Sequence, residues 1–136
     1  MATLKAGTIL INLENKKIAL VYRKDKIGYE FPKGHLEEGE TLEECSKRET
    51  EEETGRKNHI LEEIETVRYI TSKGEDVELH FYLSIDDGEI DRTIAEEDKE
   101  EIKWFSIDEA EEKLTFEDLK IFWENSRTKV LDLINK

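Results

Sequence analysis

Three glutamates near the middle of the chain have the types and the spacing of a metal-binding site. Glu49, Glu52 and Glu53 stand at positions i, i+3 and i+4, so on a helix they share one face within about one turn. Like charges at this spacing repel by about 0.2–0.5 kcal/mol per pair, and Lys47 and Arg48 are too few to neutralise the segment. A hard cation such as Mg²⁺ prefers carboxylate oxygens and also binds phosphates. The spacing alone predicts either a cation site or a solvated acidic helix face.

The helix that must carry these carboxylates has clear signals at both ends. Thr41, followed three residues later by Glu44, predicts a capping box. Gly55 predicts a C-terminal cap, so we expect a helix over 42–54. One leucine and one cysteine are its only clearly apolar residues, whereas a helix that covers a core shows an apolar stripe. Core burial does not account for such a helix, which favours a chemical role.

The three glutamates belong to a longer ordered pattern that spans 22 positions. Its members are Gly34, Glu40, Arg48, Glu49, Glu52, Glu53 and Gly55. The pattern resembles the Nudix box of the Nudix hydrolase superfamily, here 34–56, and the segment 28–35 is similar to the strand and loop that precede the box in that family. Thr50 and Arg56 depart from the box, because the family has aliphatic residues at these two positions.

The resemblance implies both a fold and a chemistry. The fold is an α/β (α+β) Nudix-like α/β/α sandwich, with a mixed β-sheet between helices, as a single domain over 1–136. The activity is that of a metal-dependent pyrophosphohydrolase that acts on phosphorus-containing acid anhydrides. Mg²⁺ is the expected cofactor, with Mn²⁺ as a possible substitute.

The resemblance also implies roles for the residues of the box. Glu52 and Glu53 are expected to be inner-sphere metal ligands, Glu49 a ligand or general base, and the carbonyl group of Gly34 a further ligand. Arg48 is expected to orient one of these carboxylates through an ion pair, in preference to an exposed position on the helix. Glu40 lies where it caps the helix or supports the metal loop, and the sequence favours neither role.

In several family members a carboxylate on the loop before the late tryptophan strand completes the site. Here five acids compete for that role: Glu96, Glu97, Asp98, Glu100 and Glu101. We expect Glu97 or Asp98 to fill it.

Basic and aromatic residues around the box are candidates for substrate binding. Arg23, Lys33 and His35 are expected to contact a polyphosphate. Phe81 and Tyr82 are neighbours in a predicted strand and point to opposite faces. Only one of these two rings can therefore stack on a base, and the sequence does not say which.

The hydrophobic periodicity predicts the elements that position these residues. We expect strands over 6–13, 18–23, 29–31, 60–70, 77–85 and 102–105, a loop over 33–40, an acidic connection over 86–99, and helices after Ser106 and Thr115. In the last helix, Leu119, Phe122 and Trp123 recur at helical spacing together with Phe116, which favours core packing over a ligand site.

Composition sets outer limits on the function. The 136 residues fit one domain with a core of its own. The net charge of −14 argues against stable nucleic-acid binding. Residues 1–33 hold seven Lys or Arg against three Asp or Glu, so the rest carries −18, which suits an anionic substrate bridged by cations. Cys45 is the only cysteine, and no apolar run is long enough for a membrane helix. We expect a cytoplasmic protein, monomeric or homodimeric.

The substrate is predicted from the same resemblance. The run from Pro32 to Glu37, with Arg48-Glu49-Thr50, looks most like asymmetrical diadenosine tetraphosphate hydrolases. Bis(5'-nucleosyl)-tetraphosphate or a related dinucleoside polyphosphate is the leading expectation. A MutT-like nucleoside triphosphate pyrophosphohydrolase is the alternative, and a non-catalytic nucleotide-binding Nudix domain is a more remote one.

Overall fold

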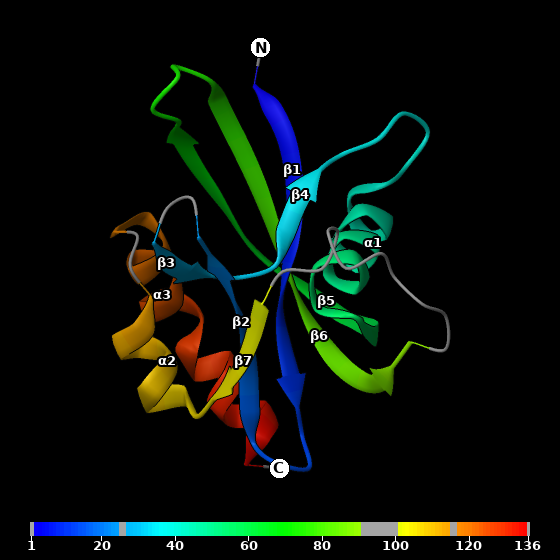
Figure 1. The fold of residues 1–136 in the computed structure, drawn as a ribbon, viewed down its shortest axis with the longest axis vertical. Helices are drawn as coiled ribbons and strands as arrows, with labels where there is room; N and C mark the ends of the chain where they lie inside the picture. Colours follow the sequence, from blue (N-terminus) through cyan, green and yellow to red (C-terminus); the bar gives the residue numbers. More distant parts are fainter. Residues whose placement is uncertain (1, 25–26, 91–100, 115–116, 136) are drawn as a thin grey trace.

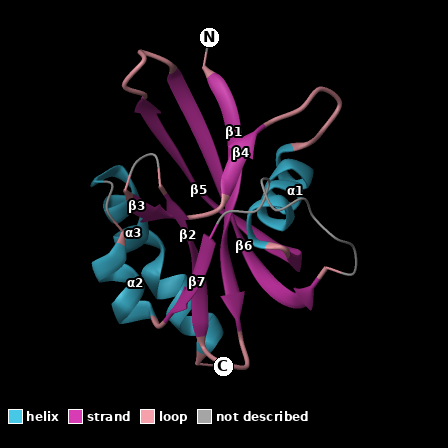
Figure 2. Cartoon of the chain, in the orientation of Figure 1, coloured by secondary structure: helices cyan, strands magenta, loops and turns pink. Residues whose placement is uncertain are grey.

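The computed structural model describes residues 2–24, 27–90, 101–114 and 117–135 of the chain. Within these ranges the chain forms seven strands and three helices. Their arrangement can be followed in Figures 1 and 2. The strands are β1 (Thr3–Asn12), β2 (Lys17–Arg23), β3 (Gly28–Glu30), β4 (Lys33–His35), β5 (Arg56–Ile70), β6 (Asp76–Glu89) and β7 (Glu101–Phe105). The helices are α1 (Leu42–Thr54), α2 (Ile107–Lys113) and α3 (Glu117–Ile134).

All seven strands belong to one mixed sheet. The order is β3-β2-β1-β6-β5, with β4 paired to β1 and β7 paired to β2. The pairing of β1 with β6 is parallel and the other pairings are antiparallel. Helix α1 lies on one side of the sheet and α2 and α3 lie on the other (Figure 1). The predicted α/β/α sandwich is therefore confirmed.

The face covered by α2 and α3 holds the main hydrophobic core. Phe81 of β6 stacks on Phe122 of α3 with ring centroids 4.2 Å apart, and Phe31 meets both rings edge-on. Trp123 is also buried in this cluster. The prediction that the last helix packs in the core is confirmed, whereas the predicted residues Thr115 and Phe116 lie outside the described part of the chain.

Helix α1 packs on the other face through small polar residues. Its buried residues are Cys45, Ser46, Thr50 and Thr54. The hydroxyl oxygens of Thr50 and Thr8 lie 2.8 Å apart, and both residues are fully buried. The helix therefore has a packing role that the sequence did not reveal, because it docks without an apolar stripe. The same contact explains the departure at Thr50, since its hydroxyl meets that of Thr8 where the family has an aliphatic residue.

Arg56, the other departure from the box, also has a partner. Its Nε and Nη2 donate to the two carboxylate oxygens of Asp86 at 2.9 and 2.8 Å, and its guanidinium lies 5.8 Å from the ring centroid of Trp104. Asn12 donates to the same carboxylate at 2.8 Å. An ion pair thus replaces aliphatic packing where α1 passes into β5.

Two predicted connections contain more strand than expected. Residues 33–35 form β4, which pairs with β1 at Lys5, Ala6 and Gly7. Gly7 makes this pairing possible, because a Cβ atom there would lie 2.4 Å from the carbonyl oxygen of Pro32. Strand β6 also continues to Glu89, beyond the predicted end at residue 85. Neither extension is visible in hydrophobic alternation. No helix in the described ranges is long and apolar enough to cross a membrane.

Candidate active site

Helix α1 is fixed at both ends, so its carboxylates stand on a defined turn. The Thr41 hydroxyl accepts from the Glu44 N–H at 3.1 Å, and the Glu44 carboxylate accepts from the Thr41 N–H at 2.9 Å. Gly55 has a φ of 72° and donates its N–H to the carbonyl oxygen of Glu51 at 2.9 Å. The predicted capping box and glycine cap are both confirmed.

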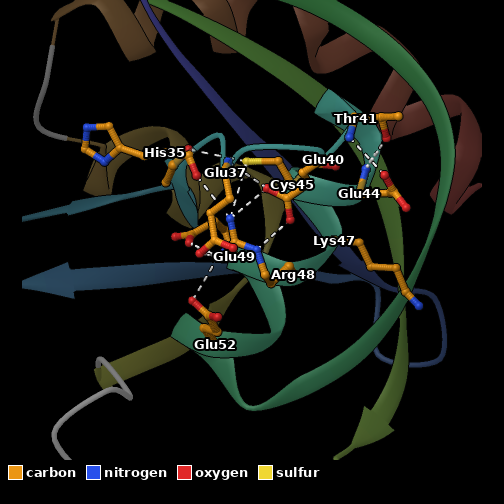
Figure 3. Close-up of polar contacts among 12 residues, drawn as sticks. His35, Glu37, Glu40, Thr41, Glu44, Cys45, Lys47, Arg48, Glu49 and Glu52 are labelled. Carbon is orange, nitrogen blue, oxygen red and sulfur yellow. Dashed lines mark hydrogen bonds and ion pairs between the residues drawn. The ribbon is translucent and has the colours of Figure 1, made fainter.

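Arg48 lies among several glutamate side chains in Figure 3. Its Nε and Nη2 donate to the two oxygens of Glu40 at 2.6 and 2.9 Å. Its Nη1 donates to Glu49 at 2.5 Å and to Glu52 at 3.2 Å, while Nη2 also reaches the carbonyl oxygen of His35 at 3.0 Å. The hydrogen bonds from Arg48 lower the pKa of Glu40 to about 2. Arg48 thus makes the internal ion pairs that the resemblance implies.

Strand β4, which precedes α1, lies close against Glu49 at Gly34. A Cβ atom at Gly34 would lie 1.6 Å from Oε2 of Glu49, so only glycine leaves room for this carboxylate. The carbonyl oxygen of Gly34 also accepts a weak hydrogen bond from the Cys45 thiol at 3.7 Å. Burial raises the pKa of this thiol to about 12, so Cys45 is a neutral donor at physiological pH.

Glu53 contacts a different set of charged groups from that of Glu49 and Glu52. One carboxylate oxygen accepts from the Lys33 N–H at 2.9 Å, and the other lies 3.2 Å from Nη1 of Arg23. Burial raises the pKa of Glu53 to about 7, and the charge of Glu30 acts in the same direction. Burial also raises the pKa of Glu49, to which the neighbouring Glu52 adds.

These residues suit a hard divalent cation. Glu49, Glu52 and Glu53 offer carboxylate oxygens and Gly34 offers a carbonyl oxygen, which is the donor chemistry that Mg²⁺ and Mn²⁺ prefer. Burial raises the pKa of Glu49 and of Glu53, and a cation bound beside them would favour their charged forms. No three His, Cys, Asp or Glu side chains in the described ranges already form a metal-binding group, because Glu49 and Glu52 are turned to Arg48 and Glu53 to Lys33 and Arg23. A cation bound there would compete with Arg48 and Arg23 for the oxygens of these carboxylates.

The remaining predicted residues are only partly brought together. Arg23 and Lys33 reach the site, whereas the His35 side chain is exposed at the end of β4 and its ring points away from Arg48 (Figure 3). Glu96, Glu97, Asp98 and Glu100 lie outside the described residues. Glu101 is the exposed first residue of β7.

The two aromatic candidates lie on opposite faces of β6, as predicted. Phe81 is fully buried in the main core, so it has no free face for a base and its assignment to substrate binding is withdrawn. Tyr82 lies on the α1 side in a small cluster with Ala6 and Cys45 and is 7% exposed. Burial raises the pKa of its hydroxyl group.

Sequence reasoning missed one charged residue of the site. Glu30 is 3% exposed, and its carboxylate accepts from Nζ of Lys33 at 2.5 Å and from Nη1 of Arg23 at 3.3 Å. A signal for it does exist, because Glu30 lies between Tyr29 and Phe31 in an alternating strand. That position predicts that its side chain points away from the aromatic core.

The fold and the acidic helix together define a Nudix-type domain, and comparison with known proteins agrees. The profile of the NUDIX domain family matches residues 1–123. The chain belongs to this family, which confirms the resemblance found in the sequence.

Two curated relatives and several solved structures are similar to the chain. It is 32% identical over 107 residues to a putative mutator protein, MutT4, of Mycobacterium tuberculosis (strain CDC 1551 / Oshkosh), covering 74% of this chain and 42% of that protein. It is 30% identical over 93 residues to the asymmetrical bis(5'-nucleosyl)-tetraphosphatase of Rattus norvegicus, covering 65% and 63%. The chain thus spans less than two thirds of either relative.

The solved structures support the fold. A C. elegans Ap4A hydrolase superposes with a TM-score of 0.76 at 20% identity, covering 96% of this chain and 99% of that one. A NUDIX hydrolase from Nitrosomonas europaea gives a TM-score of 0.69 at 20% identity, covering 99% and 89%. A NUDIX-family hydrolase from Clostridium perfringens gives 0.76 at 16% identity, covering 98% and 99%.

Proposed function

We propose that this chain is a hydrolase, dependent on Mg²⁺ or Mn²⁺, that cleaves a phosphoanhydride bond in a nucleotide-linked substrate. The observation that carries the proposal is the turn of α1 on which Glu49, Glu52 and Glu53 stand, with Gly34 pressed against Glu49. This turn keeps the charged positions of the Nudix box, which argues against a domain that only binds nucleotides.

The contacts of the site support the role that we propose for each residue. A bound divalent cation polarises a phosphoryl oxygen and lowers the pKa of a bound water. Arg48 orients Glu49 and Glu52 through its Nη1 contacts, and the Lys33 N–H orients Glu53. Arg23 and Lys33 supply positive charge for the phosphate chain. Glu97 of the acidic connection remains our choice for the completing acid.

A dinucleoside polyphosphate such as bis(5'-nucleosyl)-tetraphosphate is the proposed substrate. The run from Pro32 to Glu37 supports it, and so does the similarity to the rat tetraphosphatase. The second candidate is a nucleoside triphosphate cleaved by a MutT-like pyrophosphohydrolase, which the 32% identity to the putative mutator protein favours.

The same proposal includes the domain organisation, the cellular location and the oligomeric state of the enzyme. Residues 1–136 act as one domain, because one sheet joins β1 to β7. A cytoplasmic location fits the single cysteine, which is buried and free. The protein acts on a small nucleotide as a monomer or homodimer.

Product identity tests the proposal. The purified protein is incubated with Mg²⁺ or Mn²⁺ and a panel of dinucleoside polyphosphates, nucleoside triphosphates and nucleotide sugars. ATP plus AMP from diadenosine tetraphosphate supports the leading substrate, whereas release of pyrophosphate from nucleoside triphosphates favours the second candidate. An absence of hydrolysis across the panel with either metal contradicts the enzyme assignment.

A further inference from the structure

Glu30 is a buried carboxylate that holds two cations at the edge of the candidate active site. It belongs to β3, opposite Val21 of β2, and only 3% of its surface is exposed. Its Oε1 accepts from Nζ of Lys33 at 2.5 Å and from Nη1 of Arg23 at 3.3 Å. A charge is costly to bury unless it is paired. Strand β3 therefore holds the Glu30 carboxylate in place, and this carboxylate in turn holds Arg23 and Lys33.

Arg23 is shared between Glu30 and Glu53. Its Nη1 atom lies 3.3 Å from Oε1 of Glu30 and 3.2 Å from Oε2 of Glu53. A cation placed between two carboxylates moves toward the one that keeps its charge when the other is neutralised or bound elsewhere. The position of the Arg23 guanidinium between the two carboxylates thus depends on the charge of both glutamates.

Lys33 is tied to the same two residues through different atoms. Its ammonium group contacts Glu30, whereas its backbone N–H donates to Oε1 of Glu53 at 2.9 Å. The side chain of Lys33 is therefore engaged by Glu30, while its main chain orients the carboxylate of Glu53. Glu30 therefore holds the ammonium group of Lys33 and the guanidinium of Arg23 at the same carboxylate oxygen.

Arg48 has a similar arrangement of carboxylate partners. Its guanidinium is held by Glu40, which stands outside the predicted ligand set, while it also touches the predicted ligands Glu49 and Glu52. In the same way, Glu30 lies outside the predicted ligand set and holds Arg23, which also contacts the predicted ligand Glu53. In both cases, a carboxylate outside the predicted ligand set anchors a cation that also contacts a predicted ligand.

We propose that Glu30 is a positioning residue: its carboxylate anchors Arg23 and Lys33, so that Glu53 can exchange Arg23 for a metal ion while both cations stay beside the phosphate chain. The inference rests on the proposed function, since it takes Glu53 to be a metal ligand. It adds a residue outside the Nudix box on which metal affinity depends without direct ligation.

Mn²⁺ binding tests this role without any substrate. Free Mn²⁺ is measured by electron paramagnetic resonance during titration of wild type, Glu30→Gln, Arg23→Gln and the double variant. Loss of the Glu30 charge removes the attraction that draws Arg23 away from Glu53, so Glu30→Gln is expected to weaken Mn²⁺ binding by about tenfold in the wild-type background. In the Arg23→Gln background the same change weakens binding by only about two- to threefold, which is the direct loss of a nearby negative charge.

The comparison of the two backgrounds decides the question. Equal effects of Glu30→Gln with and without Arg23 show that Glu30 contributes only its charge, and overturn the proposal. Glu78→Gln is the matched control, because Glu78 is a partly buried carboxylate whose ion pairs are with Arg68 and His80, two residues outside the proposed site. Its Mn²⁺ affinity is expected to equal that of wild type.

A conservative variant keeps the test valid if Glu30→Gln does not fold. Glu30→Asp retains the charge but shortens the side chain by one methylene, so the anchor weakens while the direct charge effect remains. We expect a loss of Mn²⁺ affinity in wild type that disappears in the Arg23→Gln background. The same loss in both backgrounds again overturns the proposal.

Failure of this inference and failure of the proposed function give different results. If wild type binds Mn²⁺ and hydrolyses the substrate but the two backgrounds respond equally, only the role of Glu30 is wrong. If wild type neither binds Mn²⁺ nor hydrolyses any member of the panel, both are wrong. Steady-state kinetics provide a further check. The positioning role predicts that Glu30→Gln raises the KM for substrate in addition to weakening metal binding.

Discussion

Arg48 and Glu40 form a two-pronged ion pair in which Nε and Nη2 donate to the two carboxylate oxygens at 2.6 and 2.9 Å. This pair leaves Nη1 directed at Glu49 and Glu52. Glu40 therefore sets the orientation of the guanidinium, and the guanidinium sets the positions of two predicted metal ligands. We therefore expect the pair to act indirectly, by positioning Glu49 and Glu52 without contact with a metal.

Arg48→Lys is expected to lower kcat/KM by about 10- to 100-fold, the usual range when a residue that orients metal ligands is changed. A lysine keeps the charge but has no planar fork, so it cannot hold Glu40 with two bonds while it also contacts Glu49. Steady-state kinetics at saturating Mg²⁺ measure the effect. Lys47→Ala is the control, because Lys47 is half-exposed on the same helix and pairs with Glu51 at 3.6 Å. Equal activity of Arg48→Lys and wild type contradicts the orienting role.

Gly34→Ala is expected to impair metal binding far more than it impairs folding. The added Cβ atom would lie 1.6 Å from Oε2 of Glu49, so the carboxylate has to move. Gly39→Ala is the matched control, because Gly39 has a φ of 82° and open space around it. It should lose about 1 kcal/mol of stability and keep its Mn²⁺ affinity. If both variants bind Mn²⁺ like wild type, the contact between Gly34 and Glu49 has no role in the site.

Asp86→Asn is expected to destabilise the protein at pH 7 by about 1.5–3 kcal/mol, the usual worth of hydrogen bonds to a charged group. Although burial alone acts to raise it, hydrogen bonds from Arg56 and Asn12 lower the pKa of Asp86. A lowered folded-state pKa gives stability that is present above the unfolded value, near 3.9, and is lost as pH falls through the folded value. The gap between wild type and variant should therefore close below about pH 4.

Urea unfolding between pH 3 and pH 8 measures this gap. Asp87→Asn serves as control, since Asp87 is exposed and pairs with His59 at 2.8 Å. That change is expected to alter the free energy of unfolding by no more than about 0.5 kcal/mol. A constant gap between Asp86→Asn and wild type from pH 3 to pH 8 would refute the linkage.

Much of the fold could be predicted from the sequence because its signals are local. The capping residues Thr41 and Gly55 mark the ends of α1, and alternation in β6 assigns Phe81 and Tyr82 to opposite faces. Strand β4 was missed because its pairing depends on the close approach of Gly7, which is distant in sequence. The docking of α1 was missed because Thr8 and Thr50 form a buried polar contact that leaves no hydrophobic pattern.

The charged residues of the box could be predicted from the sequence, but the residues that they contact could not. The order of the box identifies Glu49, Glu52 and Glu53 as a group, and the structure places them on one turn. The sharing of Arg23 between Glu30 and Glu53 follows from the pairing of β2 with β3 and from the position of α1. These contacts join segments far apart in the chain, so spacing alone cannot reveal them.

The central claim is metal-assisted hydrolysis at the carboxylates of α1, and one comparison tests it most directly. Turnover of diadenosine tetraphosphate with Mg²⁺ is measured for wild type, Glu52→Gln, Glu53→Gln and Glu51→Gln, with circular dichroism to check folding. Removing a ligand charge should cost at least about a hundredfold in kcat, whereas Glu51→Gln on the same helix should match wild type. Folded Glu52→Gln and Glu53→Gln variants with wild-type turnover would contradict the account.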